Sequence, residues 1–256
     1  MKYFGSAVTD IGISKKTNQD SMCLKIADTK KHGQIAMVVV CDGMGGLDKG
    51  ELASAAVIRT FASWFEKELP AKLDTYSWQE LSAEWDKMVK AQNYKILEHG
   101  KIIKTNLGTT LSAMLIIEDK YMIAHVGDSR VYEISGTVKQ LTEDQTFVGR
   151  EIKRGTMTVE EAKRHPQKSV LLQCIGASRT VTPDILLGDI LPNTVYLLCS
   201  DGFRNKLTNN EIYECFNPTS ANKIKTMTQN TKYLIDLVKS RKEKDNISAA
   251  LIKCVK

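Results

Sequence analysis

Five aspartates of this 256-residue chain lie at abrupt boundaries of apolar, strand-like stretches. A single aspartate beside a glycine is usually a turn former, because its side chain bonds nearby backbone N–H groups. Turns alone are a weaker explanation for five such positions. The ends of neighbouring strands can converge in space, so we expect these carboxylates to share one site. They are Asp20 in TNQDSM, Asp42 in VVVCDGMGG, Asp128 in AHVGDSR, Asp201 in LLCSDGF and Asp245 in KEKDNIS.

The chemistry suited to such a cluster is metal-assisted. Neighbouring carboxylates repel one another unless a cation neutralises them, and oxygen ligands without His or Cys favour Mg²⁺ or Mn²⁺. Gly43, directly after Asp42, has no Cβ to block approach to its backbone carbonyl. Two such ions about 4 Å apart can hold and deprotonate a bridging water for in-line attack on phosphorus. The pattern therefore favours hydrolysis of a phosphate ester.

Other active-site patterns have less support in the sequence. The segment DGMGG matches neither GxxxxGK[ST] nor GxGxxG, which disfavours a nucleotide loop. No GxSxG segment is present, and the histidines show no HExxH spacing. A metal nuclease uses similar carboxylates, but no concentrated basic groove supports this alternative. The histidines are His32, His99, His125 and His165.

The composition is that of an ordinary globular protein, with 42% hydrophobic and 26% charged residues. The net charge of +6 is dispersed, so we expect no nucleic-acid partner. Its densest cluster, KSRKEKDN at 239–246, also contains acidic residues. It is either a solvated helix end or a basic face that attracts phosphorylated partners.

Sequence features also indicate the compartment. No apolar run approaches the ~20 residues needed to cross a bilayer, and MKYFGSAVTDIG lacks the apolar core of a signal peptide. The six cysteines form no CxxC pair and are interpreted as buried free thiols, as in a reducing compartment. We therefore expect a cytoplasmic protein with no membrane partner. No segment indicates a dimer interface, so we expect a monomer.

The elements that must position the aspartates are strands and helices in separate blocks. Helical spacing is present over 50–69 and 77–100, the second block with Ser77 as its cap and Gly100 as its end, and a third helix is expected over 220–240. The short breaks EDK and GDSR require antiparallel pairing, and the segregation indicates the α+β class. The expected strands cover 3–9, 21–27, 34–41, 109–117, 120–126, 130–134, 194–199 and 246–254.

Residues 142–180 differ from the rest of the chain. The segment is polar, has little strand character and contains a short expected helix that begins at Thr158. An insertion between strand regions is often a lid or a substrate-contacting loop. We interpret it as a flap, while its mixed charges fit a solvated surface equally well.

The whole chain resembles the metal-dependent protein Ser/Thr phosphatase family of the 2C type, in its compact bacterial form. The motifs that carry the resemblance are TDIGISKKTNQDS, VVVCDGMGG, LGTT, AHVGDSRVY, LTEDQT, GTMTVEEAKRHP, YLLCSDGF and KDNISAALI, in the family's order. The resemblance implies one catalytic domain over 1–256, folded as an α-β-β-α sandwich of two antiparallel sheets. It implies direct hydrolysis of phosphoserine and phosphothreonine by a hydroxide on two ions. It also implies phosphorylated proteins as partners, including a Ser/Thr kinase and its substrates.

The family's metal ligands transfer to five positions of this sequence. By similarity, Asp42 bridges two Mn²⁺ or Mg²⁺ ions, and Asp201 and Asp245 complete the coordination of the first. The Gly43 carbonyl serves the second ion, which reaches Asp20 through water. The resemblance thus assigns a role in coordination to most of the strand-end aspartates.

Two further positions have roles that the resemblance implies. Asp128, in the GDSR motif, matches a position that with Asp201 can hold a third, weaker ion. Lys15 occupies the place where the family usually has an arginine that clamps the substrate phosphate, and Lys16 is the weaker candidate. Lysine keeps the charge but loses the bidentate fork, so weaker phosphate binding is expected.

Four other positions depart from the family's pattern. Gln19 replaces a glutamate, Asn205 an aspartate and Gln145 a histidine. Met44 stands where animal members have a histidine, so an imidazole cannot protonate the leaving group and a metal-bound water would have to do so. Such departures motivate an alternative, in which the chain is a catalytically weak, phosphoprotein-binding member of the family.

Overall fold

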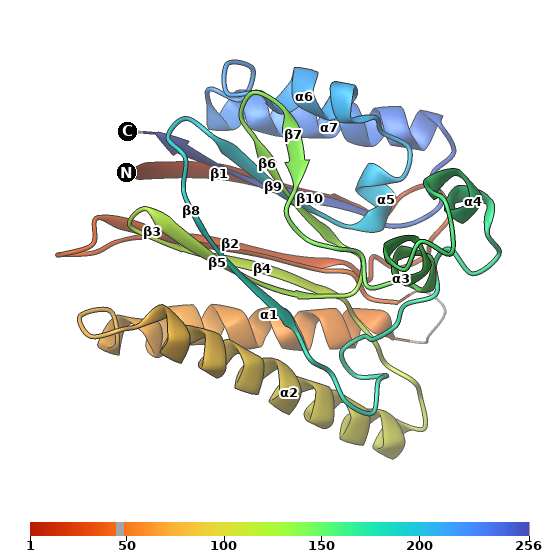
Figure 1. Cartoon of the computed structure of the whole chain (residues 1–256). Coiled ribbons are helices and arrows are strands. Elements are labelled where there is room, and N and C mark those ends of the chain that lie inside the picture. The colour runs from red at the N-terminus through yellow and green to blue at the C-terminus, as the bar shows by residue number, and fades with distance from the viewer. Residues whose placement is uncertain (45–48, 256) are drawn as a thin grey trace.

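Two antiparallel sheets pack face to face, and helices cover both outer faces (Figure 1). The structure is a computed structural model that describes residues 1–44 and 49–255. All strand pairs in the two sheets are antiparallel. The α+β expectation and the α-β-β-α arrangement are therefore confirmed.

Each sheet has five strands, and chain neighbours are mostly sheet neighbours. One sheet has the order β1-β10-β9-β6-β7 and the other β2-β3-β4-β5-β8. In the first, Asp10 at the end of β1 lies opposite Ile247 at the start of β10, so the loop after β1 starts beside Asp245. The strands are β1 (Lys2–Asp10), β2 (Ser21–Asp28), β3 (Gln34–Cys41), β4 (Leu111–Ile117), β5 (Lys120–Val126), β6 (Arg130–Ile134), β7 (Val138–Gln140), β8 (Asp184–Asp189), β9 (Val195–Cys199) and β10 (Ile247–Val255).

The helices divide between the two outer faces and the flap. Long helices α1 (Gly50–Lys67) and α2 (Trp78–Ile103), joined through the short 3₁₀ helix η1 (Leu69–Ala71), cover the sheet that contains β3. The other sheet is covered by α5 (Asp201–Arg204), α6 (Asn209–Phe216) and α7 (Ile224–Ser240). The flap contains α3 (Phe147–Lys153) and α4 (Val159–Arg164).

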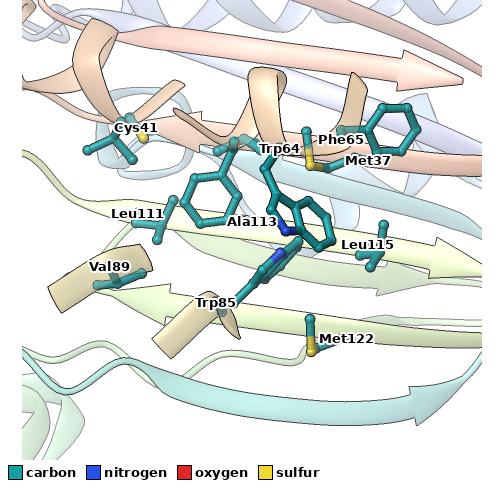
Figure 2. Close-up of a cluster of buried hydrophobic side chains, with 14 of the residues drawn as sticks. Met37, Cys41, Trp64, Phe65, Trp85, Val89, Leu111, Ala113, Leu115 and Met122 are labelled. Atoms are coloured by element: carbon teal, nitrogen blue, oxygen red, sulfur yellow. The ribbon is translucent and has the colours of Figure 1, made fainter. Parts of the chain in front are cut away.

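The apolar run of β3 is continuous because both of its faces are buried. Successive strand side chains point to opposite faces, so Met37 and Val39 face the helices and Val38 and Val40 face the other sheet. On the helix side the rings of Trp64 and Trp85 meet edge to face, with centroids 5.5 Å apart (Figure 2). This rigid layer fixes the end of β3, from which Asp42 follows.

The expected elements are present within a few residues, and some short ones were missed. Ser77 and Thr158 both cap helices with reciprocal capping boxes, which confirms the two predicted helix starts. Strands β7 and β8 and helices α3, α5 and α6 were not predicted. These elements are short, and each contains too few apolar residues to show the periodicity of a strand or a helix.

The predicted end of the second long helix at Gly100 was wrong, because α2 continues to Ile103. After α2 the chain turns back over Gly100, and the missing side chain leaves room for it. A Cβ on Gly100 would lie 2.7 Å from the Thr105 carbonyl oxygen, and the Thr105 N–H donates to the Gly100 carbonyl at 2.9 Å. Gly100 therefore permits a close return of the backbone rather than the end of the helix.

The cysteines are unpaired, as expected from the sequence. All six cysteines are free thiols; Cys23 and Cys215 are half-buried and the others buried. No helix within 1–44 or 49–255 has both the length and the apolar character needed to cross a membrane.

Candidate metal centre

The five predicted aspartates lie close enough together for the charges of four to act on the fifth, Asp42. Helix α5, which begins at Asp201, lies at the same end of the sandwich as α3 (Figure 1). Antiparallel pairing brings the ends of β3, β5 and β9 to the same edge as the starts of β2 and β10. Desolvation raises the pKa of Asp42 well above its usual value, and the charges of Asp20, Asp201, Asp128 and Asp245 raise it further. The carboxylates therefore share one electrostatic environment.

Asp42 is held by its backbone, which leaves its carboxylate free to project from the end of β3. Its N–H donates to Thr110 Oγ1 at 3.0 Å. Its carbonyl accepts from the Thr110 N–H at 2.9 Å and from Thr109 Oγ1 at 3.0 Å. Two threonines of the LGTT segment thus fix the direction in which Asp42 leaves the sheet.

Gly43 lies where three backbone segments meet. A Cβ at this position would lie 2.4 Å from the Gln19 carbonyl oxygen and 2.6 Å from that of Gly50. Its N–H donates to the Gln19 carbonyl at 3.2 Å, and no hydrogen bond among the described residues uses its own carbonyl. That oxygen is available for a cation. The adjacent glycines 45 and 46 lie outside the described residues.

Buried carboxylate oxygens without partners are the clearest feature of the site. Within the described residues, neither oxygen of Asp20 and not Oδ1 of Asp201 has a hydrogen-bond partner. Burial raises the pKa of Asp20 to about 7, helped by the charges of Asp201 and Asp245 and opposed by the hydroxyls of Ser248 and Ser200. Desolvation, with the Asp245 charge, also raises the pKa of Asp201. Buried anionic oxygens without donors fit a cation that supplies the missing charge.

The carboxylates do not form a closed cage. Among the residues that the structure describes, no three His, Cys, Asp or Glu side chains have the spacing of a finished ion site. The donors are carboxylates and one free carbonyl, which are oxygen ligands of the kind that Mg²⁺ and Mn²⁺ prefer. The chemistry of the donor set therefore fits hard divalent ions, with water completing their coordination.

Lys15 lies inside this cluster as a resident positive charge. Its Nζ is 2.8 Å from Asp245 Oδ1. Burial lowers the pKa of Lys15, but the ion pair with Asp245 and the charges of Asp42 and Asp201 outweigh burial, so the pKa is raised. The resemblance assigns Lys15 to the substrate phosphate. Because Lys15 also pairs with a predicted metal ligand, a metal ion at Asp245 would have to compete with it.

Asp128 is partly neutralised by an arginine that the sequence analysis did not single out. Arg204 of α5 has NH2 3.7 Å from Asp128 Oδ2 and 3.3 Å from Asp144 Oδ2. Burial and the Asp201 charge raise the pKa of Asp128 to about 7, against the opposing effect of Arg204. An ion at Asp128 would therefore compete with Arg204. The sequence signal that could have indicated Arg204 was its place three residues after Asp201, because residues three apart lie on the same face of a helical turn.

Asn246 fixes the loop that carries Lys15. Its Oδ1 accepts from the Gln19 N–H at 2.9 Å, and its Nδ2 donates to the carbonyls of Ile11 at 2.9 Å and Thr17 at 3.2 Å. One buried amide thus closes the loop between β1 and β2 against the start of β10. The only sequence signal was its place directly after Asp245.

Gln145, one of the departures from the family's pattern, connects the flap to the sheet. Its Oε1 accepts from the Gly127 N–H and from Gln173 Nε2, both at 2.9 Å. Its Nε2 donates to Asp184 Oδ2 at 2.8 Å. The amide joins the turn before Asp128, the end of the flap and β8.

The raised pKa values predict a pH-dependent stability for the metal-free protein. Asp20 and Asp128 have pKa values of about 7 in the folded chain against an ordinary 3.8. Between these values the folded form retains protons that the unfolded form has released, so raising the pH lowers the free energy of unfolding. For each of the two groups we expect a loss on the order of 2 kcal/mol, roughly 4–8 °C in Tm, between pH 5 and 7.5.

A variant isolates this effect from other titrations. Burial lowers the pKa of His125, which has the opposite pH dependence, so the parent is compared with Asp20→Asn by calorimetry. The Tm of Asp20→Asn relative to the parent should increase from pH 5 to 7.5, while an exposed control, Asp189→Asn, stays level. Saturating Mn²⁺ should restore the Tm that the parent loses between pH 5 and 7.5. A relative Tm that decreases with pH would contradict the prediction.

Comparison with known proteins identifies relatives over almost the whole chain. The family model described as Protein phosphatase 2C matches residues 13–239. A putative protein phosphatase 2C-type of Streptococcus pyogenes is 30% identical over 250 residues, 96% of each chain. The serine/threonine phosphatase stp of Listeria monocytogenes is 30% identical over 248 residues, 95% of this chain and 93% of the relative.

Solved structures have the same architecture. The serine/threonine phosphatase of S. agalactiae superposes with a TM-score of 0.84 and 31% identity, and all of both chains is covered. The catalytic domain of the serine threonine protein phosphatase PstP, solved in complex with 2 manganese ions, has a TM-score of 0.78, 27% identity and 99% coverage of both chains.

Proposed function

The chain belongs to the protein phosphatase 2C family, and from this membership we propose that it hydrolyses phosphoserine and phosphothreonine in proteins. The observation that carries the proposal is the convergence of five aspartates, in which burial and the charges of the other four raise the pKa of Asp42. Without a counter-charge such a cluster costs stability, and a catalytic cation is the chemical reason to retain it. Relatives along almost the whole chain are named as serine/threonine phosphatases.

The residues proposed to hold two Mn²⁺ or Mg²⁺ ions are oxygen donors of this cluster. Asp42 would lie between the ions, Asp201 and Asp245 would bind the first, and the Gly43 carbonyl and, through water, Asp20 would serve the second. The chemistry that such ions would supply is a lowered pKa for a water molecule at the site, which would make it a nucleophile for in-line attack on phosphorus. A third, weaker ion at Asp128 would have to displace Arg204.

Lys15 is proposed to bind the substrate phosphate. In the metal-free chain its ammonium pairs with Asp245. Occupation of Asp245 by a cation would release Lys15 toward the incoming phosphate dianion. No imidazole stands at Met44, so the leaving-group proton has to come from solvent water at the site.

The wider context follows from the same proposal. Residues 1–256 are treated as one phosphatase domain with the flap at 142–180, acting as a monomer in the cytoplasm. Its proposed partners are phosphorylated proteins, including a Ser/Thr kinase and the substrates of that kinase. The manganese of the PstP structure supports Mn²⁺ as the first ion to test.

The alternative is a phosphoprotein-binding member with weak turnover. Two contacts favour it: Lys15 already occupies Asp245, and Asn205 Nδ2 donates to Asp201 Oδ2 at 3.1 Å. Both contacts give a carboxylate a protein partner, so the carboxylate has less need of a metal ion as its counter-charge. Under this alternative, phosphopeptides bind but are released unchanged.

One assay separates the two functions. The purified protein is incubated with a phosphothreonine peptide and Mn²⁺, with and without a chelator. We expect phosphate release that stops when the metal is removed and returns when Mn²⁺ is restored. Binding of the peptide without release of phosphate would overturn the proposed activity and support the alternative.

A further inference from the structure

A cavity of about 310 Å³ lies between α1 and α2, apart from the aspartate cluster. These two helices run side by side on the outer face of one sheet (Figure 1). Its floor is apolar and includes Ala53, Ala56, Ile96 and Leu107. The volume is at the lower end of the range of about 300–1,000 Å³ that is typical of small-molecule sites.

The charged residues that line the cavity are positive. They are Arg59 from α1 and Lys95 from α2, and no acidic residue among those that the structure describes lines it. Within the described part of the chain, neither Arg59 nor Lys95 takes part in an ion pair, although many other lysines and arginines do. Unpaired cations around an apolar floor complement an amphiphilic anion.

An amide that lines the cavity offers a polar contact beside the charges. The Gln92 side chain lines the cavity and is only 7% exposed. Within 1–44 and 49–255 no protein group forms a hydrogen bond with its amide, whereas the neighbouring Asn93 uses both ends of its amide: it donates to the Ser178 carbonyl at 3.0 Å and accepts from the Gly176 N–H at 2.7 Å. The Gln92 amide therefore has hydrogen-bonding capacity for a polar ligand group in the cavity.

We propose that this cavity binds a small organic anion with an apolar body, an alkyl carboxylate or an alkyl phosphate. The alkyl chain lies on Ala53, Ala56 and Ile96, and the head group lies between Arg59 and Lys95. The Gln92 amide donates to an oxygen of the head group. The binding does not depend on the proposed phosphatase activity.

The position of the cavity couples it to the metal centre. Leu52 and Ala53 of its lining belong to the first turn of α1, which begins at Gly50, in close contact with Gly43. Leu107 precedes Gly108, whose carbonyl accepts from the Met44 N–H at 3.0 Å. A ligand that spreads these walls would move the backbone that directly follows Asp42, so we expect it to change the affinity for Mn²⁺ about fivefold.

The binding test uses octanoate, octyl phosphate and octylammonium as probes, titrated by calorimetry against the full chain. We expect saturable binding of at least one anion with a Kd of roughly 1 mM or tighter, and octylammonium about tenfold weaker or absent. The stronger of the two anions identifies the head group. Binding of octylammonium as tight as that of either anion, or no saturation by either anion, would overturn the proposal.

Variants locate the site. Arg59→Glu with Lys95→Glu should weaken anion binding about tenfold or more, and Arg59→Gln with Lys95→Gln provides a milder pair if the first does not fold. Lys87→Glu, an exposed lysine of α2 outside the cavity, is the matched control and should leave the Kd unchanged. Parent-like binding by the folded double variants would overturn the proposal.

The coupling is measured as the Kd for Mn²⁺ with and without the bound anion, which requires no hydrolysis. An altered Kd supports the coupling, and an identical Kd overturns it. Absence of phosphate release in the peptide assay would count against the proposed function and leave this site intact.

Discussion

Replacing Asp42 by asparagine is expected to lower kcat/KM for a phosphothreonine peptide roughly 1,000-fold or more, equivalent to about 4 kcal/mol of transition-state stabilisation. Asp42 is the carboxylate that the charges of the four other aspartates affect, and it is proposed to lie between both ions. An asparagine keeps the shape but removes the charge that retains the ions. Steady-state kinetics with saturating Mn²⁺ provide the measurement.

Stability measurements distinguish a lost metal site from a damaged fold. Removal of one charge from a crowded cluster relieves repulsion, so metal-free Asp42→Asn should have a Tm no lower than that of the parent. The increase in Tm caused by Mn²⁺ should be lost in this variant and in Asp201→Asn. Asp236→Asn, an exposed acid of α7, is the control and should behave as the parent. Near-normal turnover by Asp42→Asn or Asp201→Asn would refute the metal assignment.

Lys15 is expected to have two separable effects. Lys15→Ala should raise KM for the peptide roughly 10–100-fold, the range for losing a hydrogen bond to a charged group. The same change should lower the Mn²⁺ concentration needed for half-maximal activity, because the ammonium 2.8 Å from Asp245 no longer competes. Lys15→Arg should lower KM below that of the parent, since a guanidinium binds phosphate through two parallel hydrogen bonds.

The neighbouring lysine supplies the matched control for this series. Lys16 is exposed and carries the same charge one residue along the loop, so Lys16→Ala should change neither constant appreciably. Equal increases in KM for Lys15→Ala and Lys16→Ala would indicate only a general electrostatic effect. An unchanged KM for Lys15→Ala would remove Lys15 from the phosphate site.

Prediction from sequence was most successful where the signal is local. The β3 strand, the start of α2 at its Ser77 cap and the flap helix after Thr158 follow from residue types a few positions apart, and all are present. Prediction failed at Gly100, because the contact that requires the glycine is made by a returning chain. It also missed the short helix α5, and with it Arg204, because four residues carry no period.

The convergence of Asp20, Asp42, Asp128, Asp201 and Asp245 was the largest inference from sequence. It was possible because antiparallel pairing places the end of one strand beside the start of its partner. Aspartates at such positions therefore come to the same end of the sheet. The metal ligation itself remains a proposal: within 1–44 and 49–255 the carboxylates are close enough to raise one another's pKa, yet not arranged as a finished ion site.

The sequence by itself therefore determined the family and the α+β class, because the family is carried by motifs of consecutive residues and the class by the separation of strand-like and helical blocks along the chain. Only the tertiary structure decided which positive side chain pairs with which carboxylate. Lys15 meets Asp245 across 230 positions, and Asn246 closes the loop that carries Lys15. The cavity between α1 and α2 was likewise not visible in the sequence. Such contacts depend on the register of β1 against β10 and on helix packing, and neither leaves a local pattern in the chain.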